Sequence, residues 1–452
     1  MTVRKTLLRV GAGSAHEGDD LDAARALAED GNLDYIAFDC TSEKAVSIAY
    51  ARKQNGLPAY DVQLEAKLRA VLPGCVRRGT RILANSGAFD PEGAARLTVE
   101  VCRELGFAGL KVAYVTGSDV TDLVRHLNPT VRETGQPASE LGDRLAGALA
   151  YGGYQAMVEA LAAGADIVIT SRAGDSEQFL APMIHEFGWK LDDWDRIASG
   201  LGVGHLLECG AQITGGYFAD PGLKDVDGLH RLGFPFAEVE PSGAAVISKL
   251  PGTGGVVNEL TCKEQLLYEI GDPAAYVHAP GTVDFTTTTI REVGPNRVRV
   301  EGTTGHARTD TARVALVVKQ GAVGMGRVVY GGTGAYRRAT LAAEMVGRQL
   351  QERCGVAPSD MRFDYIGYNA LFDWGVDPDA LREIELRVTA RFGTVAEARM
   401  VQRFVSQLPV NGPAGAAWGR PIDQGGVEDV ITFFSTLVPH DRIDYRVHHL
   451  TS

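Results

Sequence analysis

The chain has 452 residues, more than a single hydrophobic core usually supports, so we expect more than one packed unit. Hydrophobic residues make up 45% and charged residues 23% of it, which argues against a disordered or fibrous protein. A net charge of -12 argues against nucleic acid as a general partner. No run of about 18 apolar residues and no signal-peptide pattern is present, so we expect a cytoplasmic protein with no membrane partner.

Residues 1–235 alternate short apolar runs with helical stretches, the pattern of a doubly wound, mostly parallel sheet. We predict strands at residues 6–10, 35–38, 81–84, 112–115 and 167–169. We predict helices at residues 20–29, 41–54, 91–105 and 154–162. Ligands of such sheets bind at the carboxyl ends of strands, so the turns after strands are the places to search for chemistry.

The pattern becomes richer in strands after residue 236. We predict strands at residues 244–249, 282–290, 297–301, 312–318, 327–330 and 384–389. Helices are expected at residues 335–354 and 395–406. The fold class predicted from this order is α/β, with a Rossmann-like domain over residues 1–235 and an α+β domain over residues 236–452.

The six cysteines are scattered, without a C-x-x-C pair and without the His and Cys spacing of a zinc site. They are Cys40, Cys75, Cys102, Cys209, Cys262 and Cys354. We expect free thiols and predict no metal centre.

The first predicted turn, residues 11–19, follows a strand and precedes a helix, as a dinucleotide-binding loop would. It departs from G-x-G-x-x-G because His16 stands where the third glycine would be. The turn could hold a nicotinamide cofactor, with Asp39 as the acid that binds the ribose. The alternative is that the turn contacts the substrate, through His16. Asn85 follows another strand and either binds a substrate carbonyl or has a structural role.

A charged pair, Arg172 and Asp175, follows the apolar strand at residues 167–169. An arginine at a strand end can bind a carboxylate or a phosphate through two hydrogen bonds. Asp175 would then be a general base or simply the ion-pair partner of Arg172.

The segment 204–216 concentrates an imidazole, a carboxylate, a thiol and an amide between glycines. On a helix, His205 and Glu208 would share one face and form a dyad for proton transfer; a metal site would need a third ligand. Cys209 is either a nucleophile or a small buried residue. Gln212 is a candidate for substrate binding.

Lys249 ends a predicted strand, and a glycine-rich turn follows it directly. The turn comprises Gly252, Thr253, Gly254 and Gly255, with Asn258 beyond it. Consecutive glycines let several backbone N–H groups converge on an anion, and Lys249 adds a positive charge. The spacing is not that of a Walker A loop. We predict either an anion site, for a carboxylate or the pyrophosphate of coenzyme A, or a tight structural turn.

Taken together, several segments resemble the acyclic terpene utilisation family of the AtuA type. They are VEALAAGADIVIT at 158–170, IHEFGW at 184–189, GHLLECGAQ at 204–212, PGTGG at 251–255, EQLLYEIGDP at 264–273 and NGPAG at 411–415. The resemblance covers nearly the whole chain. Residues 171–175 read Ser-Arg-Ala-Gly-Asp where relatives often read Gly-Arg-Val-Ala-Asp, which keeps the Arg and Asp pair.

The resemblance implies catabolism of branched isoprenoid acids through CoA thioesters, with no agreed catalytic residues to carry over. We therefore expect a lyase or hydro-lyase acting on an acyl-CoA or a branched hydroxy-carboxylate, with coenzyme A only as part of the substrate. Arg172 and the turn beside Lys249 would bind anionic groups, and His205, Glu208 and Asp175 would transfer protons.

Two alternatives stay open: a non-catalytic or co-catalytic subunit that binds a CoA ester, and an NAD(P)-dependent oxidoreductase. Longer family members add a small ferredoxin-like domain, so we expect a separate small ferredoxin-like partner here, and a homo-oligomer.

Overall fold

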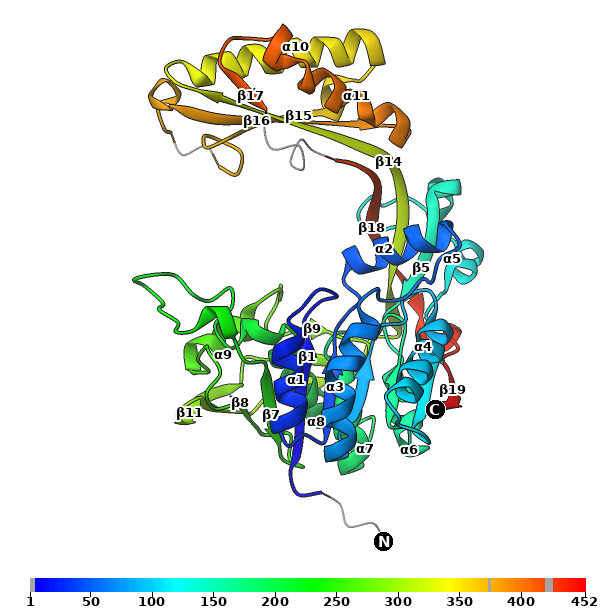
Figure 1. Ribbon diagram of the computed structural model, residues 1–452. Helices are drawn as coiled ribbons and strands as arrows, with labels where there is room; N and C mark the ends of the chain where they lie inside the picture. Colours follow the sequence, from blue (N-terminus) through cyan, green and yellow to red (C-terminus); the bar gives the residue numbers. More distant parts are fainter. Residues whose placement is uncertain (1–4, 373–374, 419–425) are drawn as a thin grey trace. The chain divides into compact units, whose positions relative to one another are not determined.

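The computed structural model describes residues 5–372, 375–418 and 426–452. The chain divides into two compact units (Figure 1). Of the described residues, one unit holds those within 5–142, 147–316 and 434–452, and the other holds those within 143–146 and 317–433. The division differs from the boundary expected near residue 236, because strands after that point extend the N-terminal sheet.

The larger unit is built on a ten-stranded sheet whose order is β11-β12-β8-β7-β1-β2-β3-β6-β4-β19. Its parallel core comprises β1 (Leu8–Ser14), β2 (Tyr35–Phe38), β3 (Arg81–Ala84), β6 (Ile167–Ile169) and β4 (Lys111–Thr116). Antiparallel strands flank this core: β7 (Pro235–Val239), β8 (Ala245–Lys249), β12 (Arg297–Glu301) and β11 (Thr289–Gly294) on one side, and β19 (Arg446–Thr451) on the other. The predicted fold class, α/β with a parallel core, is confirmed.

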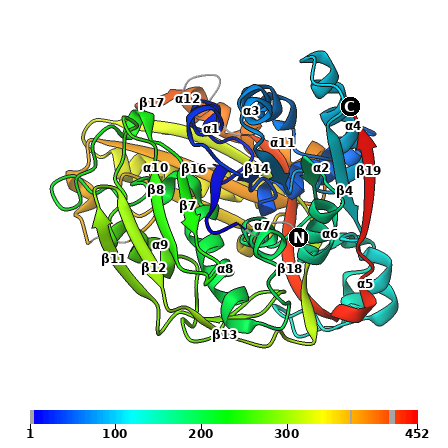
Figure 2. The ribbon, with the colours of Figure 1, turned by 90° about the horizontal axis from the view of Figure 1, so that it is seen from below.

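Alternate residues of the core strands face opposite ways, which gives two hydrophobic layers. One layer packs against α1 (Leu21–Asp30), α3 (Leu64–Arg78) and α4 (Pro91–Glu104). The opposite layer packs against α6 (Tyr154–Ala162), α7 (Glu177–Phe187) and α8 (Trp194–Glu208). Figure 2 shows these two groups of helices on the two sides of the sheet. Since helices cover both faces, the strand ends are where polar side chains can gather.

Shorter elements complete this unit. They are α2 (Glu43–Gln54), α5 (Thr121–Leu127), α9 (Glu259–Leu267), and a three-stranded sheet of β13 (Thr304–His306), β10 (Thr282–Asp284) and β9 (Tyr276–Val277). The strand predicted over residues 282–290 is therefore two strands in different sheets.

In the smaller unit, helices cover one face of an antiparallel sheet. The sheet contains β15 (Met361–Ile366), β16 (Glu383–Phe392), β14 (Thr311–Gly331) and β17 (Ala416–Trp418), and β18 (Val427–Pro439) and β5 (Leu145–Ala150) also pair with β14. Its hydrophobic core lies between the sheet and the helices α10 (Ala335–Cys354), α11 (Val395–Ser406) and α12 (Leu408–Asn411). The two strands predicted at residues 312–318 and 327–330 are parts of the single strand β14, and the unit boundary falls within it.

Candidate functional site

The carboxyl ends of β2, β3 and β6 bring three polar residues to one edge of the sheet. The three strands are parallel neighbours, and Phe38 pairs with Ala84, which in turn pairs with Ile169. The residues that follow them include Asp39, Asn85 and Arg172. Parallel register therefore places these residues side by side, at the edge where open α/β sheets bind ligands.

Asp39 is held by Asn85. The Asn85 Nδ2 atom donates to Asp39 Oδ1 at 2.7 Å, and Asn85 Oδ1 accepts from the Cys40 backbone N–H at 2.6 Å. Asn85 is fully buried, with both ends of its amide engaged, so its side chain positions Asp39 instead of facing a substrate. Burial raises the pKa of Asp39 to about 6, against the lowering effects of Arg172 and Asn85.

Arg172 is a buried cation with one open edge. Its Nη2 donates to the Tyr151 hydroxyl at 2.8 Å, and its guanidinium lies 4.4 Å from the centre of the Tyr151 ring. Glu43 lies 3.5 Å from Nη2, and Asp175 lies 4.0 Å from Nη1, which is beyond hydrogen-bond reach. None of the residues that the structure describes accepts a hydrogen bond from Nη1, so this side keeps donors available to bind an anion.

Asp175 lies beside this cation, with 37% of its side chain exposed. Desolvation by the surrounding protein and the negative charge of Asp39 raise the pKa of Asp175 well above its usual range, although Arg172 opposes the change. No described residue donates a hydrogen bond to Asp175 Oδ1, whereas Asp39 accepts one from Asn85. Desolvation and the charge of Asp39 thus favour the protonated form of Asp175, whereas the hydrogen bond from Asn85 favours the ionised form of Asp39.

Several buried polar atoms near these strand ends have no hydrogen-bond partner in the described chain. They include Thr41 Oγ1, Ser86 Oγ, Thr170 Oγ1, Asp175 Oδ1, Glu177 Oε2 and both amide atoms of Gln178. An unpaired buried polar atom costs about 1–3 kcal/mol. Such a concentration is typical of an edge built to bind a polar molecule.

The predicted contact between His205 and Glu208 on a helix is confirmed. The His205 Nδ1 and Glu208 Oε1 atoms are 2.9 Å apart on α8, and Glu208 Oε2 accepts from Ser176 Oγ at 2.7 Å. The second imidazole nitrogen, Nε2, lies 3.2 Å from the Leu266 carbonyl oxygen, to which it can only donate. Burial lowers the pKa of His205, but its contacts with Glu208 outweigh burial and raise it overall. Because both ring nitrogens are engaged, His205 is suited to support Glu208 more than to meet a substrate.

Cys209 is half-buried and follows Glu208 directly. Desolvation and the charge of Glu208 raise the pKa of its thiol, the opposite of what a nucleophilic cysteine needs. Gln212 is half-buried and ends a short 3₁₀ turn, Gly210–Gln212. His16 is exposed, and its Nδ1 accepts from the Gly18 backbone N–H at 3.1 Å. No contact among the described residues assigns a role to any of these three side chains.

The first turn gives no support to a dinucleotide site. Gly11 and Gly13 lie within β1, where a Cβ atom would come within 2.6 Å of Leu33 and 2.5 Å of Phe38 respectively. Strand packing therefore explains these glycines. The N-terminus of α1 is capped by the carboxylate of Asp20, which would repel a phosphate.

The hydrogen bonds of the glycine-rich turn after β8 are those of a structural turn. Lys249 Nζ donates to the Thr253 carbonyl at 2.8 Å and to Thr253 Oγ1 at 3.3 Å. The N–H groups of Gly254 and Gly255 donate to the carbonyls of Arg231 and Asp227 respectively. An anion there would have to break these bonds, so the structural alternative is the one that the hydrogen bonds favour.

Two further observations concern the same turn. Gly252 has φ of 79°, in the left-handed region that favours glycine. Asn258 accepts from the Thr261 N–H at 2.9 Å and forms the capping box of α9, which explains it without a ligand.

Comparison with known proteins gives one match. The family model for the acyclic terpene utilisation family protein AtuA matches residues 8–449, nearly the whole chain. The chain belongs to the AtuA family. The resemblance seen in the sequence is thereby confirmed. No curated protein and no solved structure matches the chain.

In this AtuA-family member, the sequence analysis missed two aromatic residues, Tyr151 beside Arg172 and Tyr276 beside His205. It also gave Asp39 no role in proton transfer. Asp39 follows a strand just as Asn85 and Arg172 do, so the same signal could have marked it for proton transfer. Tyr151 and Tyr276 lie in segments whose sequence carries no such signal. Their place near Arg172 and His205 comes from the tertiary structure.

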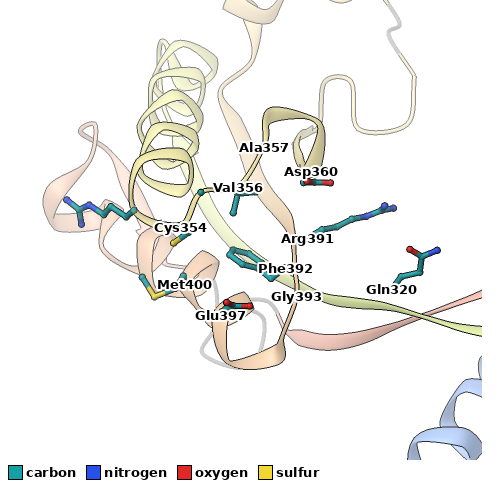
Figure 3. Close-up of a pocket in the computed structure, with 12 residues that line it drawn as sticks. Gln320, Cys354, Val356, Ala357, Asp360, Arg391, Phe392, Gly393, Glu397 and Met400 are labelled. Carbon is teal, nitrogen blue, oxygen red and sulfur yellow. The ribbon is translucent and has the colours of Figure 1, made fainter. Parts of the chain in front are cut away.

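The smaller unit has a pocket of about 720 Å³ where α10 ends, lined also by residues of β16 and α11 (Figure 3). Its charged side chains are of mixed sign, with Arg353 and Arg391 against Asp360 and Glu397. Glu397 is occupied in the capping box of α11, and Arg353 lies 5.7 Å from the Phe404 ring centre. No single ligand chemistry follows from this lining.

Neither a metal site nor a membrane span emerges from the described ranges. Within residues 5–372, 375–418 and 426–452, no three His, Cys, Asp or Glu side chains gather as metal ligands would. None of the helices described is both long and apolar enough to cross a bilayer. All six cysteines are free thiols, as expected.

Proposed function

We propose that this protein is a lyase of the hydro-lyase type, which adds or removes water next to the carbonyl of a branched hydroxy-carboxylate or of its acyl-CoA thioester. The observation that carries the proposal is the pair of carboxyl groups, Asp39 and Asp175, beside the open edge of Arg172. Proton-transfer groups are expected to have pKa values shifted toward the working pH. The AtuA family, named for acyclic terpene utilisation, is consistent with a branched substrate.

The proposed reaction uses the single proton of the pair. Ionised Asp39 takes the proton from the carbon next to the carbonyl, and protonated Asp175 gives its proton to the hydroxyl group on the neighbouring carbon. The C–O bond breaks, a C=C bond forms and one water molecule leaves. The pair keeps one proton, which has moved from Asp175 to Asp39, and hydration is the same sequence in reverse.

The remaining groups have supporting roles in the proposal. Arg172 binds the anionic group of the substrate through its Nη1 side. Asn85 keeps Asp39 oriented and lowers its pKa relative to Asp175. His205 balances the charge of Glu208, which lies close enough to raise the pKa of both Asp39 and Asp175.

The test is an assay in D₂O with branched 3-hydroxy acids and their CoA thioesters. Mass spectrometry would follow both the loss of water and the entry of deuterium at the carbon next to the carbonyl. We expect the wild type to catalyse both, and Asp175→Asn to be slower by about 10²–10⁴-fold, the usual effect of losing an acid–base group.

Asp122→Asn is the matched control, because the Asp122 side chain is 99% exposed and should leave the rate unchanged. Thermal unfolding of each variant would verify folding. A wild type inert toward the whole panel, or an Asp175→Asn variant as fast as the wild type, would contradict the proposal.

A further inference from the structure

Tyr276 on β9 is connected to Asp175 through neighbouring residues. A chain of contacts connects the two: Asp175 precedes Ser176, Ser176 Oγ donates to Glu208 at 2.7 Å, and Glu208 lies 2.9 Å from His205 Nδ1. The centres of the His205 and Tyr276 rings are then 5.4 Å apart. Tyr276 therefore lies beside the pair of His205 and Glu208, on an element that does not belong to the parallel sheet.

The Tyr276 ring is fixed by aromatic neighbours. It meets the His278 ring edge-on at 4.4 Å and packs against Phe285 at 6.1 Å, in addition to His205. Tyr276 is half-buried, and its hydroxyl makes no hydrogen bond to the part of the chain that the structure describes. A rigid ring with an unpaired hydroxyl is suited to donate to a ligand.

We propose that Tyr276 is a further catalytic residue, which donates a hydrogen bond to the carbonyl oxygen of the substrate as negative charge develops there. The inference rests on the proposed function, because that charge arises when the neighbouring carbon loses its proton to Asp39. It narrows the substrate to compounds whose reacting carbon lies next to a carbonyl, so that an enolate oxygen forms in the site.

The surroundings of Tyr276 favour a donor over a base. Burial raises the pKa of its phenol, and the charges of Glu208 and Asp175 raise it further, so the hydroxyl stays protonated near neutral pH. The neighbouring His278 also offers a polar atom, because its Nε2 is buried and has no hydrogen-bond partner among the described residues. Burial and the neighbouring His205 lower the pKa of His278 to about 3, which keeps its ring neutral.

The experiment compares two small probes by calorimetry. The nitronate form of 3-nitropropionate has a planar carbon and a full negative charge on each of two oxygens, as the deprotonated substrate would, whereas the carboxylate of succinate in the same place shares one charge between two oxygens. We expect the wild type to bind the nitronate more tightly than succinate. Tyr276→Phe keeps the ring and should lose about tenfold or more of the nitronate affinity while retaining its affinity for succinate.

Tyr217→Phe is the matched control, because Tyr217 is 88% exposed, and it should bind both probes as the wild type does. If the wild type binds the nitronate more tightly and Tyr276→Phe does so equally well, the role of Tyr276 is overturned while the proposed function stands. The same conclusion follows if the wild type binds both probes equally. If the wild type binds neither probe, the proposed anion site fails and the inference fails with it.

Discussion

The turns after β6 and β8 both follow a strand and both carry a cation, yet they differ in how their polar groups are used. After β6, Arg172 keeps an open edge, and Asp175 and Thr170 have oxygens without a hydrogen-bond partner in the described part of the chain. After β8, Lys249 and the glycine N–H groups donate to backbone carbonyls within the same unit. Glycine content therefore marks tight backbone geometry, whereas unpaired buried polar atoms mark a place for a ligand.

The largest expected effect is on the affinity for an anionic ligand, which tests whether Arg172 or Lys249 binds it. Arg172→Met should weaken binding of 3-hydroxy-3-methylbutanoate by about 100-fold or more, because it removes charge-assisted hydrogen bonds in a site shielded from water. Lys249→Met should leave the affinity unchanged within about twofold. Calorimetry measures both, and Arg172→Lys, which keeps the charge, should fall between them. The opposite ranking of Arg172→Met and Lys249→Met would move the anion site to the glycine turn.

A second effect distinguishes packing from binding within the turn itself. A Cβ atom on Gly254 would lie 2.0 Å from the Gly228 carbonyl oxygen, whereas one on Gly252 meets nothing within 4 Å. Gly254→Ala should therefore lower the free energy of unfolding by about 2–4 kcal/mol. Gly252→Ala should lower it by about 1 kcal/mol, from its positive φ alone. Urea denaturation measures both, and weaker ligand binding by folded Gly252→Ala would restore the anion site there.

The smallest effect is a pH dependence at the strand-end edge. Asp39 keeps its proton up to about pH 6 in the folded protein, against an ordinary value of 3.8. Between these values the folded state binds more protons, so rising pH lowers the free energy of unfolding, by at most about 1.4 kcal/mol per pH unit. In Asp39→Asn, the free energy of unfolding measured by urea denaturation should fall less steeply between pH 4 and pH 6 than in the wild type. Parallel curves for the two proteins would show that Asp39 titrates normally.

Much of the fold could be predicted from local sequence. The strands β2, β3 and β6 and the helices α6, α10 and α11 have the predicted bounds, because their apolar patterns and end signals are local. The helix α3 was missed because it contains Pro73 and Gly74, which normally interrupt helices. Gly74 is needed there because a Cβ atom would lie 2.9 Å from the Ala28 backbone.

Pairings distant in sequence could not be predicted in the same way. The strands β7 and β8 join the N-terminal sheet because β7 pairs with β1, more than 200 residues earlier, and nothing local in their sequence indicates this partner. The same limit applies to the candidate site. Local pattern marked Arg172, Asp175 and the pair of His205 and Glu208, but only the tertiary structure brings Tyr276 to them.

The most direct test of the central claim is a crystal structure of the protein with 3-hydroxy-3-methylbutanoate bound. The account predicts the carboxylate on Arg172, with the hydroxyl group within hydrogen-bond distance of Asp175. A carboxylate bound by Lys249 and the N–H groups of residues 252–255 would contradict it.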